Sequence, residues 1–224
     1  MMKKILLLLI VLYPMFAIAQ SYEEIKKVRD QLVENTDRFL TVKGIELRPG
    51  LKMAELLRQL RSKGLKDTEA SDYIQQIAGG YELAGTFFEH YNCKIKLLPT
   101  SNDKSIVGVV NITFPDANSF RQVKDVYDEL KAALSRKYVL NECSEGFESD
   151  YVDEELSDTR KFLSVLKDEA KFESRFCLSE DNLSLLLGQV VLSISHYELS
   201  CYVSLTYSTS DNVVNQLSST DNDL

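Results

Sequence analysis

The sequence contains no tryptophan, only two histidines, four prolines and four cysteines among 224 residues. It has no C-x-x-C pair, no G-x-S-x-G element and no H-E-x-x-H element, so the common signatures of thiol redox proteins, serine hydrolases and zinc proteases are missing. It also lacks a concentrated basic tract, and its formal net charge is −8. Phosphate backbones and anionic lipid heads repel such a chain, which argues against nucleic acid as a partner.

Residues 1–19 have the layout of a cleavable secretory signal. Lys3 and Lys4 precede an apolar run at 5–16, and Ala-Ile-Ala comes directly before Gln20. The run is shorter than the roughly 20 apolar residues that a membrane span needs; an uncleaved anchor is the alternative. The first cysteine is Cys93, so none stands at the cleavage point to accept a lipid. We expect a periplasmic or secreted chain without membrane insertion, whose charge changes from −8 to −10 when the two lysines are removed.

Hydrophobic periodicity divides the remaining chain into helices and strands. Residues 20–38 predict an N-terminal helix, and 40–47 predict a strand. The next helix ends at Gly64, where a left-handed cap residue is expected. Its apolar stripe consists of Met53, Leu56, Leu57 and Leu60. From Tyr81 to residue 114 the period becomes two, which predicts three antiparallel strands and completes a first unit at 39–115.

A second unit at 116–210 follows the same order. A helix is predicted at 119–137 and a strand at 138–143, before an insertion at 144–170 that is acidic first and then helix-like. Three further strands end near Tyr207, and 211–224 form a polar tail. The sequence therefore predicts an α+β fold of two helix-plus-antiparallel-meander repeats, with the helices packed on one face of the sheet. A chance likeness between the two halves is the alternative.

Several short segments resemble a family of uncharacterised secreted proteins from gut Bacteroidetes. The segments are Val42 to Leu47, Lys63 to Leu65, Leu83 to Phe87, Leu130 to Tyr138 and Cys201 to Tyr207. Because they consist of glycines and strand apolar residues, the resemblance transfers no catalytic residue. The duplicated layout is also similar to that of the β-lactamase inhibitor protein and its PepSY-like relatives, whose repeated units form a concave sheet that binds other proteins. This likeness implies an architecture and no function by itself.

The two histidines are the weak candidates for a metal site. His90 and His196 each stand beside a tyrosine and within five residues of a cysteine, which is compatible with a zinc site of two histidines and two cysteines. However, His196 continues the alternation of Val190, Leu192 and Ile194, so it also fits the end of a buried strand face. We assign no metal and no cofactor.

The four cysteines are expected to form two disulfides, because an exported chain folds in an oxidising compartment. Strand alternation predicts that Cys93 and Cys201 point toward the helices and that Cys143 and Cys177 point away from them. Two cysteines on opposite faces of a sheet cannot bond. The favoured pairs are therefore Cys93 with Cys201 and Cys143 with Cys177, out of three possible pairings.

These observations favour an exported, non-catalytic binding module that acts on a protein partner as an inhibitor or assembly factor. One alternative is a metal-dependent or carboxylate-based hydrolase that uses the two histidines and nearby acids. The acidic run at 142–155 adds acids, although it lacks the D-x-D-x-D-G spacing of a calcium loop. The other alternative is a small-ligand or glycan binder, which the 11 tyrosines leave open.

Overall fold

The computed structural model describes residues 26–36, 39–148, 156–179 and 184–210. The chain divides into two compact units, Met1–Asp37 and Arg38–Leu224. In the first unit, the described part is a helix at 26–35, which lies within the N-terminal helix predicted at 20–38. The predicted signal at 1–19 and the predicted tail at 211–224 lie outside the described residues.

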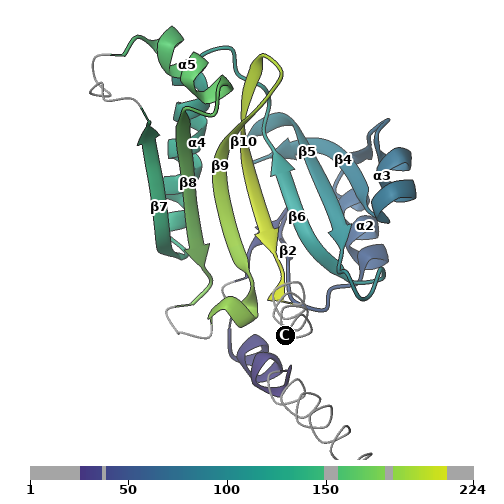
Figure 1. The fold of residues 1–224 in the computed structure, drawn as a ribbon. Coiled ribbons are helices and arrows are strands. Elements are labelled where there is room, and N and C mark those ends of the chain that lie inside the picture. Colours follow the sequence, from purple (N-terminus) through teal and green to yellow (C-terminus); the bar gives the residue numbers. More distant parts are fainter. Residues whose placement is uncertain (1–25, 37–38, 149–155, 180–183, 211–224) are drawn as a thin grey trace, which may run out of the picture. The chain divides into compact units, whose positions relative to one another are not determined.

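The second unit is built on one large antiparallel sheet, which Figure 1 shows face-on. Its strand order is β3-β4-β5-β6-β10-β9-β8-β7, so that β6 and β10 join the two halves at its centre. The strands are β3 (Lys66–Asp67), β4 (Tyr81–Phe87), β5 (His90–Pro99), β6 (Val107–Thr113), β7 (Val139–Phe147), β8 (Ala170–Cys177), β9 (Gln189–Tyr197) and β10 (Ser200–Ser208).

In the described part of this unit, four α-helices and one short 3-10 helix accompany the sheet. Along the chain the order from α2 to β6 is helix, strand, helix and three strands, and the same order runs from α4 to β10 except that η2 precedes β9. The α+β class and the antiparallel strands predicted at 81–114 and 172–207 are thus confirmed. The helices are α2 (Met53–Ser62), α3 (Ser71–Ala78), α4 (Phe120–Ser135), α5 (Asp158–Leu166) and η2 (Ser184–Leu187).

The helices α2 and α4 form where the apolar spacing predicts them. The α2 stripe of Met53, Leu56, Leu57 and Leu60 is buried, and Gly64 follows the helix with φ of 89°. The α4 helix begins after Ser119, whose hydroxyl accepts a hydrogen bond from the Gln122 N–H at 3.2 Å. Its buried face consists of Phe120, Val123, Tyr127, Leu130 and Leu134.

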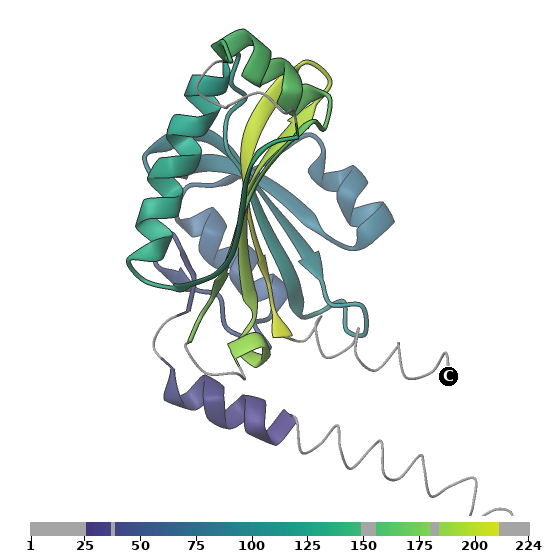
Figure 2. The same cartoon turned by 60° about the vertical axis from the view of Figure 1, so that its left-hand side comes forward.

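The helices do not all lie on one face, which corrects the predicted arrangement. Figure 2 shows α4 and α3 on opposite sides of the sheet. The α4 side chain Tyr127 bonds Ser174 of β8, and α5 contacts α4. In contrast, α3 lies beside the edge of the sheet at β4, where the Ser71 hydroxyl accepts a hydrogen bond from the Glu82 N–H. The sequence places no helix here, because α3 is only eight residues long.

Two other predicted segments differ from the structure. The strand predicted at 40–47 is a hairpin of β1 (Thr41–Val42) and β2 (Ile45–Glu46). Its two-residue turn places Lys43 and Gly44 at φ of 53° and 76°, as tight hairpin turns require. The insertion predicted at 144–170 is shorter, because β7 continues to Phe147.

Candidate functional site

One face of the large sheet carries polar side chains and has no described helix over its middle strands (Figure 1). Directly opposed residues in neighbouring strands project from the same side, so the strand register defines two rows across this face. We call these two rows the open face. The first row is Ser144, Glu173, Ser193, Ser204, Thr113 and Lys94, and the second is Glu142, Arg175, Val191, Thr206, Asn111 and Lys96.

The centre of the open face is held by hydrogen bonds between side chains of β6 and β10. The Asn111 amide nitrogen donates to the Ser204 hydroxyl at 2.8 Å and to the Thr206 hydroxyl at 2.7 Å. The Thr113 hydroxyl in turn donates to the Asn111 amide oxygen at 3.1 Å. These bonds fix the orientation of four polar side chains on the strands that join the two halves. The centre is therefore polar and ordered.

The two ends of the open face differ in charge. Lys94 and Lys96 on β5 supply positive charge at one end. At the other end, Arg175 Nε lies 2.9 Å from the Glu173 carboxylate and 3.6 Å from the Glu142 carboxylate, and these contacts raise the pKa of Arg175. Strands β5 and β8 are four strand spacings apart, or about 19 Å. A complementary surface would therefore carry acids opposite β5.

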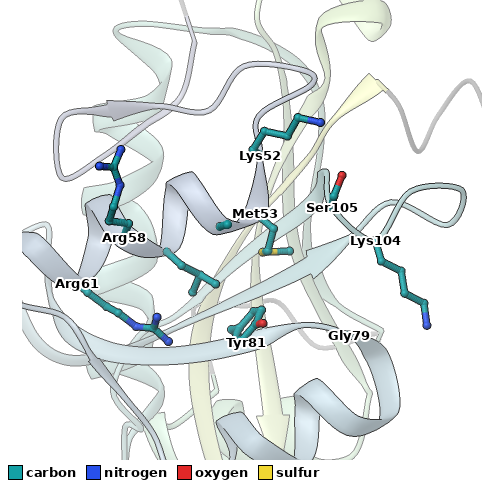
Figure 3. A pocket seen from close by; sticks show the side chains of 10 residues that line it. Lys52, Met53, Arg58, Arg61, Gly79, Tyr81, Lys104 and Ser105 are labelled. Atoms are coloured by element: carbon teal, nitrogen blue, oxygen red, sulfur yellow. The ribbon is translucent and has the colours of Figure 1, made fainter.

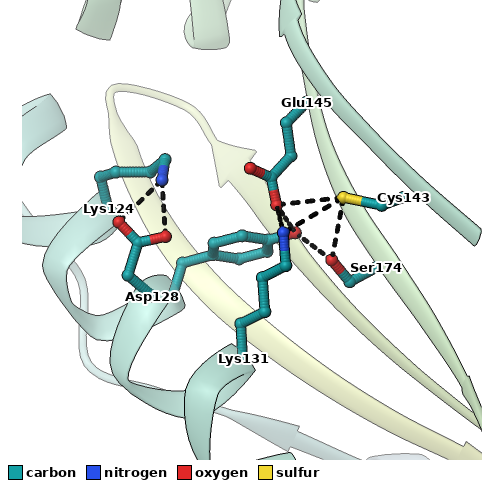
Figure 4. A network of polar contacts seen from close by, with 7 residues as sticks. Lys124, Asp128, Lys131, Cys143, Glu145 and Ser174 are labelled. Carbon is teal, nitrogen blue, oxygen red and sulfur yellow. Dashed lines mark hydrogen bonds and ion pairs between the residues drawn. The ribbon is translucent and has the colours of Figure 1, made fainter. Parts of the chain in front are cut away.

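A second polar cluster lies on the opposite side of the sheet, between α4 and strands β7 and β8 (Figure 4). The fully buried Tyr127 hydroxyl is 2.9 Å from Glu145 Oε1 and 2.8 Å from Ser174 Oγ. Glu145 also forms an ion pair with Lys131, whose Nζ lies 3.2 Å from Cys143 Sγ. We call these five residues the α4–β7 network. The sequence does not reveal it, because the partners come from three separate segments.

The α4–β7 network joins α4 to β7 and β8 and so fits a structural role. Desolvation by burial raises the pKa of Tyr127. Desolvation also acts to raise the pKa of Glu145, but hydrogen bonds from Lys131, Tyr127 and Cys143 outweigh it and the pKa is lowered. The Cys143 sulfur lies 3.2 Å from Lys131 Nζ and 3.4 Å from Glu145 Oε1. The polar groups of the network therefore bond one another.

The structure does not bring the two histidines together. His90 on β5 and His196 on β9 are separated by β6 and β10, which is about 14 Å across the sheet. His90 Nε2 lies 3.5 Å from Glu129, and His196 Nε2 lies 3.1 Å from Asp168. The zinc site considered from the sequence is therefore not formed. Within the described part of the chain, no group of three metal-ligating His, Cys, Asp or Glu side chains occurs.

All four cysteines are free thiols, so the two predicted disulfides are not formed. Cys93 and Cys201 are buried on the side of the sheet that α4 covers, toward the helices as predicted. However, β6 separates their strands, and two strand spacings of about 10 Å exceed the Cα separation of a disulfide. The pairing of Cys143 with Cys177 fails for another reason. Their register partners are Ser174 and Val139, several positions apart along the strands.

Cys143 also faces the α4 side of the sheet, although it was predicted to point away from the helices. The register of β7 shifts between Leu140 and Glu142, so one additional residue reverses the alternation of side chains beyond it. Cys143 is therefore brought beside Lys131 of α4. The alternation of apolar and polar residues in the sequence does not indicate such a bulge.

The acidic run at 142–155 is partly described. Glu142 lies on the open face and Glu145 belongs to the α4–β7 network, so the two carboxylates project from opposite sides of β7. They are therefore not arranged as a paired-carboxylate site. Residues 149–155 lie outside the described residues.

No helix in the ranges that the structure describes is long and apolar enough to cross a membrane. Comparisons of the chain with protein-family models, with curated proteins and with solved structures find no match.

Proposed function

We propose that this chain is an exported, non-catalytic binding module that engages a protein partner through the open face, as an inhibitor or assembly factor. Export rests on the signal-like layout of residues 1–19. We further propose that the two halves are duplicated units whose layout is similar to that of the β-lactamase inhibitor protein. The shared element order and the meeting of β6 with β10 at the centre support this relation. It is an analogy of architecture only.

The observation that carries the proposal is the ordered polar centre of the open face, over which no described helix lies. An antiparallel sheet with one solvated face needs only polar side chains there. Here, however, Asn111 is fixed by three hydrogen bonds to side chains of two strands. Side chains held in place before binding lose less conformational entropy when a partner docks. The polar centre is therefore better suited to recognition than freely moving surface residues.

The dimensions of the open face also support a protein partner. The whole side of the sheet on which the two rows lie has five strand spacings from β7 to β5, or about 24 Å, and its strands of seven to ten residues are about 23–34 Å long. The product is roughly 550–800 Å². A standard protein–protein interface buries about 800 Å² on each partner. The side of the sheet that contains the open face is thus of the right size for one protein and large for a small ligand.

Affinity capture with a matched pair of variants tests the proposal. The chain from residue 20 onward is used as bait in the envelope and culture fluid of the source organism. Thr206→Glu places a carboxylate at the centre of the open face, and Thr159→Glu makes the same change on exposed α5. Urea unfolding first establishes that both variants fold. We expect one protein in near-equal amount with the unchanged bait and with Thr159→Glu.

Loss of that protein with Thr206→Glu, by about tenfold or more in affinity, would support the open face as the binding site. Equal recovery with both variants would place the interface elsewhere. If neither fraction yields a specific protein, the proposal of a tight protein partner is refuted.

A further inference from the structure

A hollow beside α2 has an unusual charge for this chain (Figure 3). The chain has 34 acidic and 26 basic residues, yet the lining includes four cationic side chains and no acid. The four cations are Lys52, Arg58, Arg61 and Lys104. They come from the start of α2, from its exposed side and from the loop between β5 and β6.

The cations of the hollow are only partly neutralised by protein acids. Arg61 forms an ion pair with Asp67 at 2.9 Å. Within the described residues, no ion pair is found for Lys52, Arg58 or Lys104. Lys52 has an acid nearby, because hydrogen bonds from Ser105 and the charge of Lys52 together lower the pKa of Asp103. An excess of positive charge therefore remains around the hollow.

The floor of the hollow is apolar. Met53 and Leu57 are buried side chains of α2 that line the hollow. The half-buried Tyr81 lies across from Met53, and Arg61 extends toward Tyr81 (Figure 3). The hollow measures about 570 Å³, which is within the range of small-molecule sites. A bare inorganic anion would leave most of this space unfilled. The lining therefore matches a ligand with both an anionic group and an organic body.

We propose that this hollow binds a small organic phosphate or sulfate ester. Its oxyanion would contact the cationic rim, where Arg side chains can donate paired hydrogen bonds to such groups. Its organic body would rest on Tyr81, Met53 and Leu57. This inference is independent of the proposed function, because the hollow and the open face lie on opposite sides of the sheet. Tyr81 pairs with Leu97, whose side chain projects opposite to that of the open-face residue Lys96.

Calorimetric titration with four simple probes tests the proposal. The probes are phenyl phosphate, phenyl sulfate, inorganic phosphate and phenol, each added at low ionic strength. We expect saturable binding of phenyl phosphate or phenyl sulfate, with inorganic phosphate and phenol at least about fivefold weaker, because each lacks one part of the contact. The stronger of the two esters identifies the preferred oxyanion. Added salt should weaken binding, because the cations are exposed.

Lys104→Gln and Arg61→Gln should each weaken binding of the preferred ester by at least about fivefold. Lys63→Gln is the matched control, because Lys63 is exposed at the end of α2 and does not line the hollow. Equal affinity for phenol would overturn the proposal, as would unchanged affinity in both test variants or the absence of saturable ester binding. The same variants should still capture the protein partner of the open face. A negative result for ester binding therefore does not bear on the proposed function.

Discussion

Replacement of Tyr127 by phenylalanine tests whether the α4–β7 network stabilises the fold. The change removes one hydroxyl that is fully buried and has two hydrogen-bond partners, Glu145 at 2.9 Å and Ser174 at 2.8 Å. A neutral hydrogen bond contributes about 1 kcal/mol, and one to a charged group contributes about 1.5–3 kcal/mol. Glu145 keeps its ion pair with Lys131, which reduces the loss. We therefore expect Tyr127→Phe to lower the free energy of unfolding by about 2 kcal/mol.

Urea unfolding followed by circular dichroism measures this change. With an m-value of about 3 kcal/mol/M, the midpoint should fall by roughly 0.7 M. Tyr81→Phe is the control. The Tyr81 hydroxyl accepts a hydrogen bond from the exposed Gln75 side chain at 2.8 Å, so this substitution should cost less than about 0.5 kcal/mol. A double-mutant cycle with Ser174→Ala should give a coupling energy of about 1 kcal/mol. A loss below about 0.5 kcal/mol for Tyr127→Phe would refute the reasoning.

Three further predictions concern thiols, a glycine and pH. In the folded protein without reductant, a thiol reagent should modify the exposed Cys143. The buried Cys201, whose pKa is raised by desolvation to about 11, should react only after unfolding. Fewer than four reactive thiols in denaturant would indicate a disulfide. Gly80→Ala should cost about 1–3 kcal/mol in urea unfolding, because its Cβ would lie 2.4 Å from a carbonyl oxygen, whereas Gly146→Ala should be near neutral; equal effects would contradict the packing. Because folding lowers the pKa of Glu145, its carboxylate stabilises the fold above the ordinary pKa of 4.5, and this stabilisation is lost as pH falls through the folded pKa. The difference in free energy of unfolding between the unchanged chain and Glu145→Gln should therefore shrink over that pH range. A difference that stays constant with pH would contradict the shift.

The sequence predicts those elements whose periodicity extends over several turns or residues. The stripe that begins at Met53 locates α2, and the alternation around Ile112 and Leu205 locates strands on both sides of the central junction. The two-residue β3 and the eight-residue α3 are too short for a periodic signal. The orientation of Cys143 depends on one additional residue in β7, which alternation alone does not reveal.

The open face is only partly predictable from the sequence. Its small polar residues, such as Thr206 and Asn111, stand at the alternate positions of strands whose other positions are apolar, so a polar side is expected. Their contact across β6 and β10 depends on the pairing of two strands that are far apart in the sequence, since Asn111 and Ser204 are 93 positions apart. The hollow beside α2 is less predictable still, because Lys104 joins it from a loop.

The two ends of the sheet carry unequal risks of aggregation. At one end β3 offers only two residues to an incoming strand, whereas at the other end β7 offers nine. A long edge strand is a template on which a second chain can add. Glu142 and the neighbouring Glu148 are exposed acids along this edge, so two copies would repel each other there. Loss of these two charges would remove that protection, which makes β7 the strand from which fibrils would be expected to grow.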